Sequence, residues 1–458
     1  MDRKDRPLLA ILICLSLSIW LFIFSFDNSS YHHHFSITFQ WIRHRQQPPP
    51  PPQPSDPCKG RYIYVHSLPT RFNLDMLHDC RSLLQWHDMC SSSNNLGLGP
   101  SLSTEDLISS SAWFNTNQFM LDLIFFHRMR RYPCLTNNSS RASAIYVPFF
   151  AGLDTGRYLF DSPNTSSSAR DALALDLADW LVARPEWAAM GGRDHFLVCG
   201  RITWDFRRKA ADAGGWGSRL FGLSAVKNMT RLLIERDTAD DDEFGVPYPT
   251  YFHPSRDEEV FEWQGKLRVM ERPQLYSFAG GPRPGMSALR DRIIERCERS
   301  DRCALMRCDS NSTGCYTPRR VMDMLERSVF CLQPPGDSFT RRSVFDSMLA
   351  GCIPVFFYTE TAYAQYNWHL PGNHTSYSVF IPEAEVTEGK VDLEERLSGI
   401  GMEVVEAMRE ELIRMVPRLV YADPRGRLEV VEDAFDVAVK GVIERVEMLR
   451  REREKRNA

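Results

Sequence analysis

The sequence predicts an α/β fold in which two Rossmann-like domains, each a parallel sheet covered by helices, face each other across a cleft. Three observations carry this prediction. Short apolar strands alternate with helical patterns through most of the chain. The length of 458 residues exceeds that of one typical domain. Turns rich in glycine, proline and arginine follow several of the strands, as expected where parallel strands meet a ligand.

Eight short runs rich in apolar, β-branched and aromatic residues are typical of buried strands. They are Arg61–His66, Ala144–Phe150, His195–Cys199, Leu275–Ala279, Ala304–Arg307, Ser328–Leu332, Cys352–Phe357 and Tyr377–Ile381. Helical patterns lie at Trp113–Arg130, Asp171–Val182, Ser287–Arg299, Pro318–Arg327, Met402–Val416 and Glu429–Arg451. We therefore predict a first domain at residues 58–270, a second at 271–400 and C-terminal helices at 401–458.

Composition excludes one class of partner. The formal net charge is −4, so no domain-wide basic field is present, and we expect no binding of nucleic acid.

An uncharged apolar run, Leu8–Phe26, follows Arg3, Lys4 and Arg6. At about 1.5 Å per residue it spans a bilayer core of roughly 30 Å. The positive-inside rule predicts a type II signal-anchor, with residues 1–7 in the cytosol and the body in the lumen. The alternative is a cleaved signal peptide, but the run is long and no A-x-A-like site follows it. Residues 27–57, with prolines at 48–52, are expected to form an extended stalk.

Cysteines and glycosylation motifs agree with a lumenal body. Eleven of the twelve cysteines follow the apolar run, and the densest cluster is Cys297, Cys303, Cys308 and Cys315. Its spacing lacks the C-x-x-C pairs of a zinc site, so we predict disulfides, with at least one cysteine left free or bridged to another chain. N-glycosylation sequons begin at Asn28, Asn137, Asn138, Asn164, Asn228, Asn311 and Asn373.

The most informative segment, Ser328–Phe357, reads as strand, loop, helix and strand. Ser338 or Thr340 is expected to cap the helix, and Gly351 to end it at the C′ position. Free N–H groups and the helix dipole make such a helix start an anion site.

The same helix carries charges that fit a nucleotide. Arg341 and Arg342 add two cations where the dipole disfavours them, which indicates an anionic partner such as a pyrophosphate. Asp346 could accept hydrogen bonds from ribose hydroxyls. The alternative is an arginine pair solvated on an ordinary surface helix.

A second turn, Tyr276–Gly285, leads from a strand through glycine and proline to a helix. Arg283 in the turn and Arg290 on the helix could neutralise a diphosphate. The motif alone is weak, but opposite the first one it completes a nucleotide cleft.

A third group stands in the first half, where Gly192–Arg208 delivers Trp204 and Asp205 to a strand end. Asp205 could be the base that deprotonates an acceptor hydroxyl, and Trp204 could stack on a sugar. The alternative for Asp205 is an ion pair with Arg201, Arg207 or Arg208. His66, after the first strand, is the second base candidate.

Two further stretches of the sequence contain residues that could bind a ligand. Tyr366 and Trp368 follow a predicted strand and suit either stacking on an acceptor sugar or core packing. Asp240–Glu243 could suggest a metal site, but a solvated acidic loop is the favoured interpretation. We predict no metal ligands.

These segments together resemble plant exostosin-like glycosyltransferases, and among them the xyloglucan galactosyltransferase (KATAMARI-like) branch. The matching motifs, in order, are CKGRYIYVHSLPTRFN, AIYVPFFAGLD, GRDHFLVCGRITWDFRR, PYPTYFHP, SFAGGPRPG, FCLQPPGDSFTRRSVFDSMLAGCIPVFF and YAQYNWHLP. They run from Cys58 through the strand ending at Ile381.

The resemblance implies a GT-B fold and inverting transfer from UDP-galactose to a xyloglucan-type wall polysaccharide. It implies no obligatory metal or other cofactor, and a Golgi membrane location. It places the donor on the second domain, where Arg283, Ser338, Arg341 and Asp346 fall in corresponding motifs. The implied partners are a UDP-sugar, a polysaccharide acceptor, the Golgi membrane and other Golgi glycosyltransferases.

Other readings stay open. The donor could be UDP-galacturonic acid or UDP-arabinose, since many arginines and lysines are present and none is placed by sequence. A non-catalytic Golgi scaffold or carbohydrate-binding protein is a different class, which the retained arginine pair argues against. A glycoside hydrolase would need two opposed carboxylates, and no such pair stands out.

Overall fold

The computed structural model describes residues 56–457 except 86, 103–110, 161–164, 284–287 and 309–313. Residues Asp56–Ala458 form one compact unit. The predicted anchor, and the predicted stalk up to residue 55, lie outside the described residues. Among the helices described, none has the length and apolar character needed to cross a membrane.

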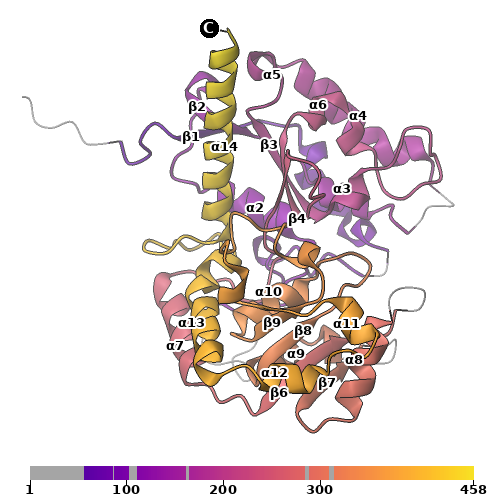
Figure 1. Cartoon of the computed structure of the whole chain (residues 1–458). Helices are drawn as coiled ribbons and strands as arrows, with labels where there is room; N and C mark the ends of the chain where they lie inside the picture. Colours follow the sequence, from indigo (N-terminus) through magenta and orange to yellow (C-terminus); the bar gives the residue numbers. More distant parts are fainter. Residues whose placement is uncertain are drawn as a thin grey trace, which may run out of the picture. The chain divides into compact units, whose positions relative to one another are not determined.

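The first sheet holds five parallel strands in the order β1-β2-β3-β4-β5 (Figure 1). Its central strand is buried along nearly its whole length, which explains its continuous apolar sequence. The strands are β1 (Tyr62–Val65), β2 (Ala142–Tyr146), β3 (His195–Ile202), β4 (Thr230–Glu235) and β5 (Glu243–Gly245).

The second sheet is also five-stranded and parallel, in the order β10-β9-β8-β6-β7. Each of the last five predicted strands is found here. They are β6 (Gln274–Gly280), β7 (Cys303–Arg307), β8 (Ser328–Gln333), β9 (Ile353–Phe356) and β10 (Val379–Phe380). The predicted α/β class with two parallel sheets is confirmed.

Helices cover both sheets. With the first sheet are α2 (Leu121–Met129), α3 (Ala151–Gly156), α4 (Ser167–Val182), α5 (Pro185–Met190) and α6 (Ser224–Lys227). With the second are α7 (Asp257–Val269), α8 (Leu289–Glu298), α9 (Pro318–Glu326), α10 (Arg342–Leu349), α11 (Glu383–Thr387), α12 (Leu393–Ser398) and α13 (Met402–Leu419).

Helix α7 marks where the second layer begins. Trp263 on α7 packs with Leu349 of α10 and Ile413 of α13, and its indole N–H donates to the Leu349 carbonyl at 2.9 Å. The second layer therefore begins at α7, ahead of the boundary that we predicted after residue 270.

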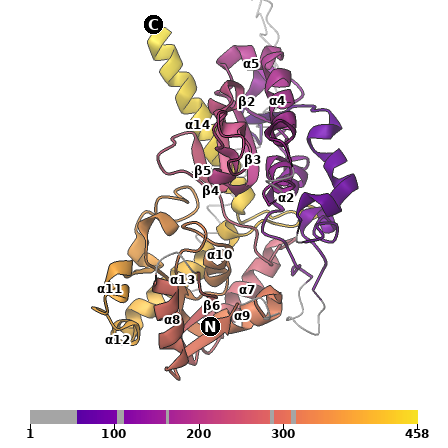
Figure 2. The ribbon, with the colours of Figure 1, turned by 90° about the vertical axis from the view of Figure 1, so that its right-hand side faces the viewer.

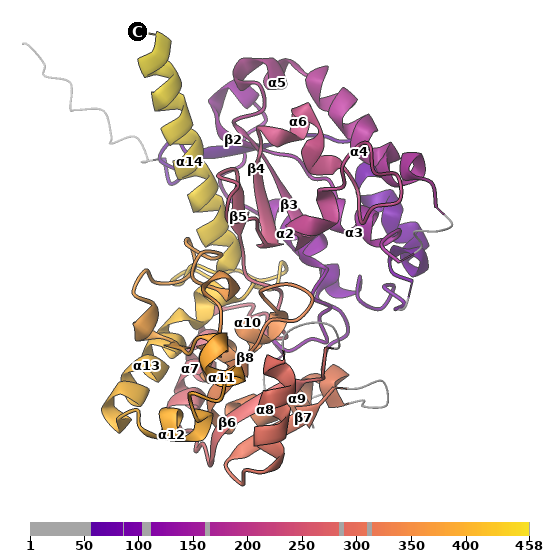
Figure 3. The same ribbon diagram turned by 45° about the vertical axis from the view of Figure 1, so that its right-hand side comes forward.

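The last helix, α14 (Ala434–Asn457), returns to the first sheet and packs against β2. Arg450 on α14 donates to the Ala142 carbonyl at 2.9 Å. Helix α14 runs alongside the first sheet in Figures 1 and 2, and Figure 3 shows β3 and β4 between α14 and α4. The C-terminal helices predicted as one segment are thus divided between the two sheets.

One predicted helix is shorter than expected. The pattern beginning at Trp113 forms a helix only from Leu121. The preceding residues are tied to another segment, because Trp113 bridges Phe252 and the Phe114 N–H donates to the Tyr251 carbonyl at 2.9 Å. Tertiary pairing overrides the helical spacing here.

Cysteines behave as predicted. Cys199 is buried and free, and within the dense cluster Cys297 pairs with Cys303 and Cys308 with Cys315. The other bonded pairs are Cys58–Cys134, Cys80–Cys90 and Cys331–Cys352. The sequon asparagines at 137, 138, 228 and 373 are exposed, and the other three lie outside the described residues.

Candidate functional site

A cavity of about 300 Å³ lies between loops of the two sheets. We call it the inter-sheet pocket. Its walls come from segments that directly follow β3, β6, β8 and β9 and from the start of α8, which is the edge where parallel sheets place ligands. The lining residues are Trp204, Arg283, Leu289, Arg290, Pro335, Gly336, Asp337, Ser338, Phe339 and Tyr358. Four predicted site residues from three separate motifs meet here: Trp204, Arg283, Arg290 and Ser338.

Arg290 fastens the two glycine- and proline-rich loops together. Its guanidinium donates to the carbonyls of Pro335 at 2.7 Å, Gly281 at 3.2 Å and Pro334 at 3.3 Å. Burial, together with the nearby guanidiniums of Arg341 and Arg283, lowers the pKa of Arg290 to about 10. Arg283 and Arg290 therefore line the pocket, and Arg341, which is not part of its lining, lies near enough to repel the Arg290 charge.

The partners of the other two arginines balance only part of this charge. Arg283 is half-exposed and lies 3.5 Å from the Asp337 carboxylate. Arg341 donates to the Ser338 hydroxyl at 3.1 Å, and its Nη2 lies 3.7 Å from Asp337. That nitrogen is buried without a hydrogen-bond partner in the described part of the chain. The surplus of cations makes the pocket suited to an anion.

Glu235, the last residue of β4, is a functional candidate that the motifs did not reveal. It is fully buried, and its carboxylate accepts from the Ser338 hydroxyl at 2.6 Å and the Thr340 N–H at 3.2 Å. Its Oε1 has no partner among the described residues. Burial raises the pKa of Glu235, while these donors and Arg341 oppose the rise. A carboxylate of the first sheet thus occupies part of the anion site predicted before α10.

The predicted caps of α10 are wrong. The helix begins at Arg342 with Arg341 at the N-cap position, and no side chain caps it. Thr340 is buried and its hydroxyl bonds that of Tyr366 at 3.1 Å, so only Ser338 reaches the pocket. Gly351 does follow the helix with φ of 65°, as predicted for C′.

Arg342 and Asp346 also depart from their predicted roles. They pair with each other at 3.2 Å, one helical turn apart, and Arg342 stacks over Tyr251 and donates to the Thr116 carbonyl. Asp346 is buried, and burial raises its pKa to about 6 against the opposing effect of Arg342. Arg342 lines a different cavity, of about 610 Å³, so neither side chain lines the inter-sheet pocket.

Asp205 lies directly beside Trp204 but is buried under its neighbours. Its Oδ1 accepts from the indole N–H of Trp216 at 2.7 Å, and its Oδ2 lies 3.6 Å from Arg201. Burial raises the pKa of Asp205, and Arg201 and Trp216 oppose the rise. The ion pair with Arg201 that we considered as the alternative is therefore present, next to a residue that lines the pocket.

His66 is remote from this site. Its Nε2 lies 3.0 Å from that of His195, the first residue of β3, whereas Asp205 follows the last. At about 3.3 Å per residue the strand separates the two ends by about 23 Å. Burial and His195 lower the pKa of His66 to about 3. This position does not support a base at the pocket.

Two aromatic residues predicted to bind the acceptor belong to the core. Tyr366 is fully buried and donates to the Ile234 carbonyl at 2.7 Å. Trp368 stacks on Phe244 with ring centroids 4.1 Å apart, and a Cβ at Gly441 would overlap its ring.

Asp240 and Glu243, in the acidic run 240–243, form ion pairs, so the solvated acidic loop that we favoured is wrong for these two residues. Asp240 pairs with Arg207 and Arg231, each at 2.8 Å, and Glu243 is fully buried beside the same two arginines. In the described ranges, no group of three or more His, Cys, Asp or Glu side chains could hold a metal ion.

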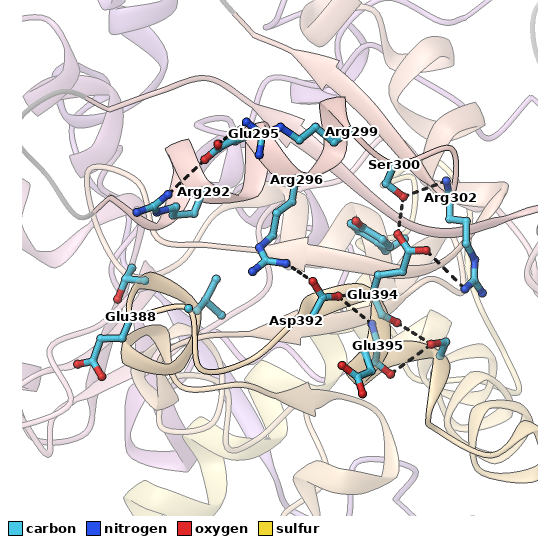
Figure 4. Close-up of a pocket in the computed structure, with 15 residues that line it drawn as sticks. Arg292, Glu295, Arg296, Arg299, Ser300, Arg302, Glu388, Asp392, Glu394 and Glu395 are labelled. Carbon is cyan, nitrogen blue, oxygen red and sulfur yellow. Dashed lines mark hydrogen bonds and ion pairs between the residues drawn. The ribbon is translucent and has the colours of Figure 1, made fainter.

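A larger cavity, of about 740 Å³, lies between α8, α11 and α12 (Figure 4). Its charges largely pair among themselves, as in Arg296 with Asp392 and Arg292 with Glu295. Ser300 and Arg302 place it at the amino end of β7, the edge opposite the inter-sheet pocket. Its charge balance and place in the sheet make it the weaker candidate for a nucleotide.

Comparisons with known proteins agree on one family. The model of the exostosin GT47 domain matches residues 57–397. Xyloglucan galactosyltransferase MUR3 of Arabidopsis thaliana is 54% identical over 399 residues, which are 87% of this chain and 64% of that protein. Probable xyloglucan galactosyltransferase GT15 is 48% identical over 86% of this chain and 84% of its own length. Xyloglucan-specific galacturonosyltransferase 1 is 38% identical over 85% and 58%. Both of the latter are also from Arabidopsis thaliana.

Proposed function

The chain belongs to the exostosin GT47 family, and from that premise we propose that it is an inverting glycosyltransferase of GT-B type. It transfers galactose from UDP-galactose to a side chain of xyloglucan. The relatives that carry this activity in their names support the choice of donor and acceptor. Two parallel sheets with a pocket between their carboxyl-end loops support the GT-B assignment.

The observation that carries the proposal is the set of guanidiniums around the inter-sheet pocket. Arg283 and Arg341 lie close enough to Arg290 to lower its pKa, with Asp337 as the nearest opposing charge. The leaving diphosphate gains negative charge in the transition state, so cations already in place stabilise that state more than the ground state. Fixed arginines could supply this without a metal.

The transfer itself exchanges two bonds. The acceptor hydroxyl oxygen attacks the anomeric carbon, the bond from that carbon to the diphosphate oxygen breaks, and UDP leaves with the bonding electrons. Asp205 takes the hydroxyl proton as general base. Attack opposite the leaving group inverts the anomeric centre.

We place the body in the Golgi lumen behind a type II anchor at residues 8–26. The basic residues before that run support the orientation. The five disulfides and the exposed sequon asparagines of the described residues support an oxidising, glycosylating compartment.

A transfer assay tests the function. The full chain in detergent is incubated with a xylosylated glucan oligosaccharide and, separately, UDP-galactose, UDP-galacturonic acid or UDP-arabinose. We expect the mass gain of one hexose with UDP-galactose alone. A mass gain of the oligosaccharide with another UDP-sugar alone would identify that sugar as the donor. No mass gain with any of the three donors, by a folded chain, would contradict the enzyme assignment.

A further inference from the structure

Exposed aromatic rings lie around Asp205, one in the inter-sheet pocket and two beyond it. Trp204 is 44% exposed, Trp216 46% and Phe160 54%. The Trp216 indole N–H bonds Asp205, and Phe160 meets the Trp216 ring edge-on with centroids 5.0 Å apart. We call Trp204, Trp216 and Phe160 the aromatic platform. Large aromatic side chains exposed together are unusual on a soluble surface and mark a binding site.

The loop that presents Trp216 is held in place. Buried Arg170 on α4 donates to the carbonyls of Ala213 and Gly215, both just before Trp216, at 2.5 and 2.7 Å, and to that of Gly217, just after it, at 3.5 Å. Arg208 donates to the Gly217 carbonyl at 3.0 Å. The exposure of Trp216 is therefore built into the fold, and the ring is preorganised for a ligand.

The same loop is built directly onto Asp205. The Ser218 N–H donates to the Asp205 carbonyl at 2.9 Å. Gly217 has φ of 73°, and a Cβ there would overlap that carbonyl, so only glycine permits the approach. The Trp216 indole N–H thus donates to the Asp205 carboxylate, while the ring is about half exposed to solvent.

Chemistry selects a neutral sugar chain as the ligand. The C–H faces of pyranose rings stack on aromatic faces, whose negative quadrupole attracts them. One platform residue, Trp204, also lines the inter-sheet pocket, so a chain on the platform would present a hydroxyl between Asp205 and the donor. Arg201, the cation beside Asp205, is already paired with that carboxylate, which favours a neutral over an acidic polysaccharide.

We propose that Trp216 and Phe160 extend Trp204 into a binding platform for the neutral glucan acceptor, and that Trp216 also positions the Asp205 base. The inference rests on the proposed function and adds two residues to it. Trp216 binds the acceptor through its ring and holds Asp205 through its N–H.

Acceptor binding is measured first, by calorimetry of the full chain with a xylosylated glucan oligosaccharide and no donor. Phe160→Ala and Trp216→Ala should each weaken binding roughly three- to tenfold, as for loss of an aromatic contact. UDP affinity should stay unchanged. Phe261→Ala removes a similarly exposed phenylalanine (46%) on α7 and should change neither the acceptor affinity nor the UDP affinity.

Trp216→Phe separates the two roles. The ring is kept, so acceptor affinity should stay within about twofold, well below the loss for a missing aromatic contact. The lost N–H raises the pKa of Asp205, so the acidic limb of kcat moves to higher pH. Arg201 and the buried Tyr248, the other groups near Asp205, are unchanged.

The outcomes are distinct. The proposal would be overturned if both alanine variants bind the acceptor normally, or if Phe261→Ala loses as much affinity as they do. It would also be overturned if the variants change the oligomeric state and keep their sugar binding, or if the acidic limb of kcat in Trp216→Phe stays at the wild-type pH. A wild-type chain that binds the oligosaccharide through the platform but transfers no sugar would contradict the proposed function and leave the platform standing. If the wild-type chain transfers sugar but the alanine variants bind the oligosaccharide normally, the platform would be refuted and the proposed function would stand.

Discussion

At the residue scale, Glu235 links the two halves of the inter-sheet pocket. Its carboxylate comes from β4 of the first sheet and accepts hydrogen bonds from the loop before α10 of the second. A buried carboxylate with a raised pKa disfavours the ionised folded state. The residue therefore orders the donor loop while weakening stability at neutral pH.

Glu235→Gln tests this balance. The folded-state pKa lies above the unfolded one, so wild-type stability falls as pH rises between the two values. The amide oxygen can still accept from Ser338 and Thr340. We expect the variant to melt a few degrees higher than wild type near pH 8 and at the same temperature near pH 4, where the carboxyl is protonated.

The matched control is Glu262→Gln on the exposed face of α7, which should leave the melting temperature unchanged at both pH values. A Glu235→Gln protein that is less stable than wild type near neutral pH would show that the ionised carboxylate stabilises the fold.

At the scale of single elements, the sequence located all eight strands that it predicted but not β4 or β5. β4 reads TRLLIE, with an arginine inside the strand. Arg231 is buried there because Asp240 and Glu243 pair with it. No local sequence pattern shows such a pairing. Because β4 was not predicted, Glu235 at its end was not predicted as a site residue either. The run RLLI beside a sequon was the available signal.

The same contrast holds for the site. Trp204, Arg283, Arg290 and Ser338 could be predicted because strand ends of parallel sheets converge. Trp216 could not, because its approach to Asp205 depends on the path of a loop. The pairing of Arg342 with Asp346 was open to prediction, since residues four apart face each other on a helix.

At the scale of the whole molecule, a buried ion pair joins three distant segments. Asp433, just before α14, is fully buried and lies 3.0 Å from Arg128 of α2. It also accepts from the N–H of Ala422, which follows α13, at 2.7 Å. The returning C-terminal helix is thereby fixed to elements of both sheets.

Asp433→Ala should cost about 3–5 kcal/mol of unfolding free energy, because among the described residues it leaves the buried Arg128 charge with the more distant Asp436 as its remaining ion-pair partner. Urea denaturation followed by circular dichroism measures it. Glu432→Ala, at the neighbouring exposed carboxylate, should stay within about 0.5 kcal/mol. Equal effects of the two variants would mean that the buried pair does not hold the helix.

The central claim is that the donor diphosphate binds at the cations of the inter-sheet pocket, and calorimetric titration of UDP-galactose into the full chain tests it most directly. Arg341→Ala should weaken binding by at least about tenfold, as expected for lost charge-assisted hydrogen bonds of about 1.5–3 kcal/mol. Arg292→Ala, in the larger cavity of Figure 4, should bind as wild type. Unchanged affinity in Arg341→Ala, or an equal loss in Arg292→Ala, would contradict the account.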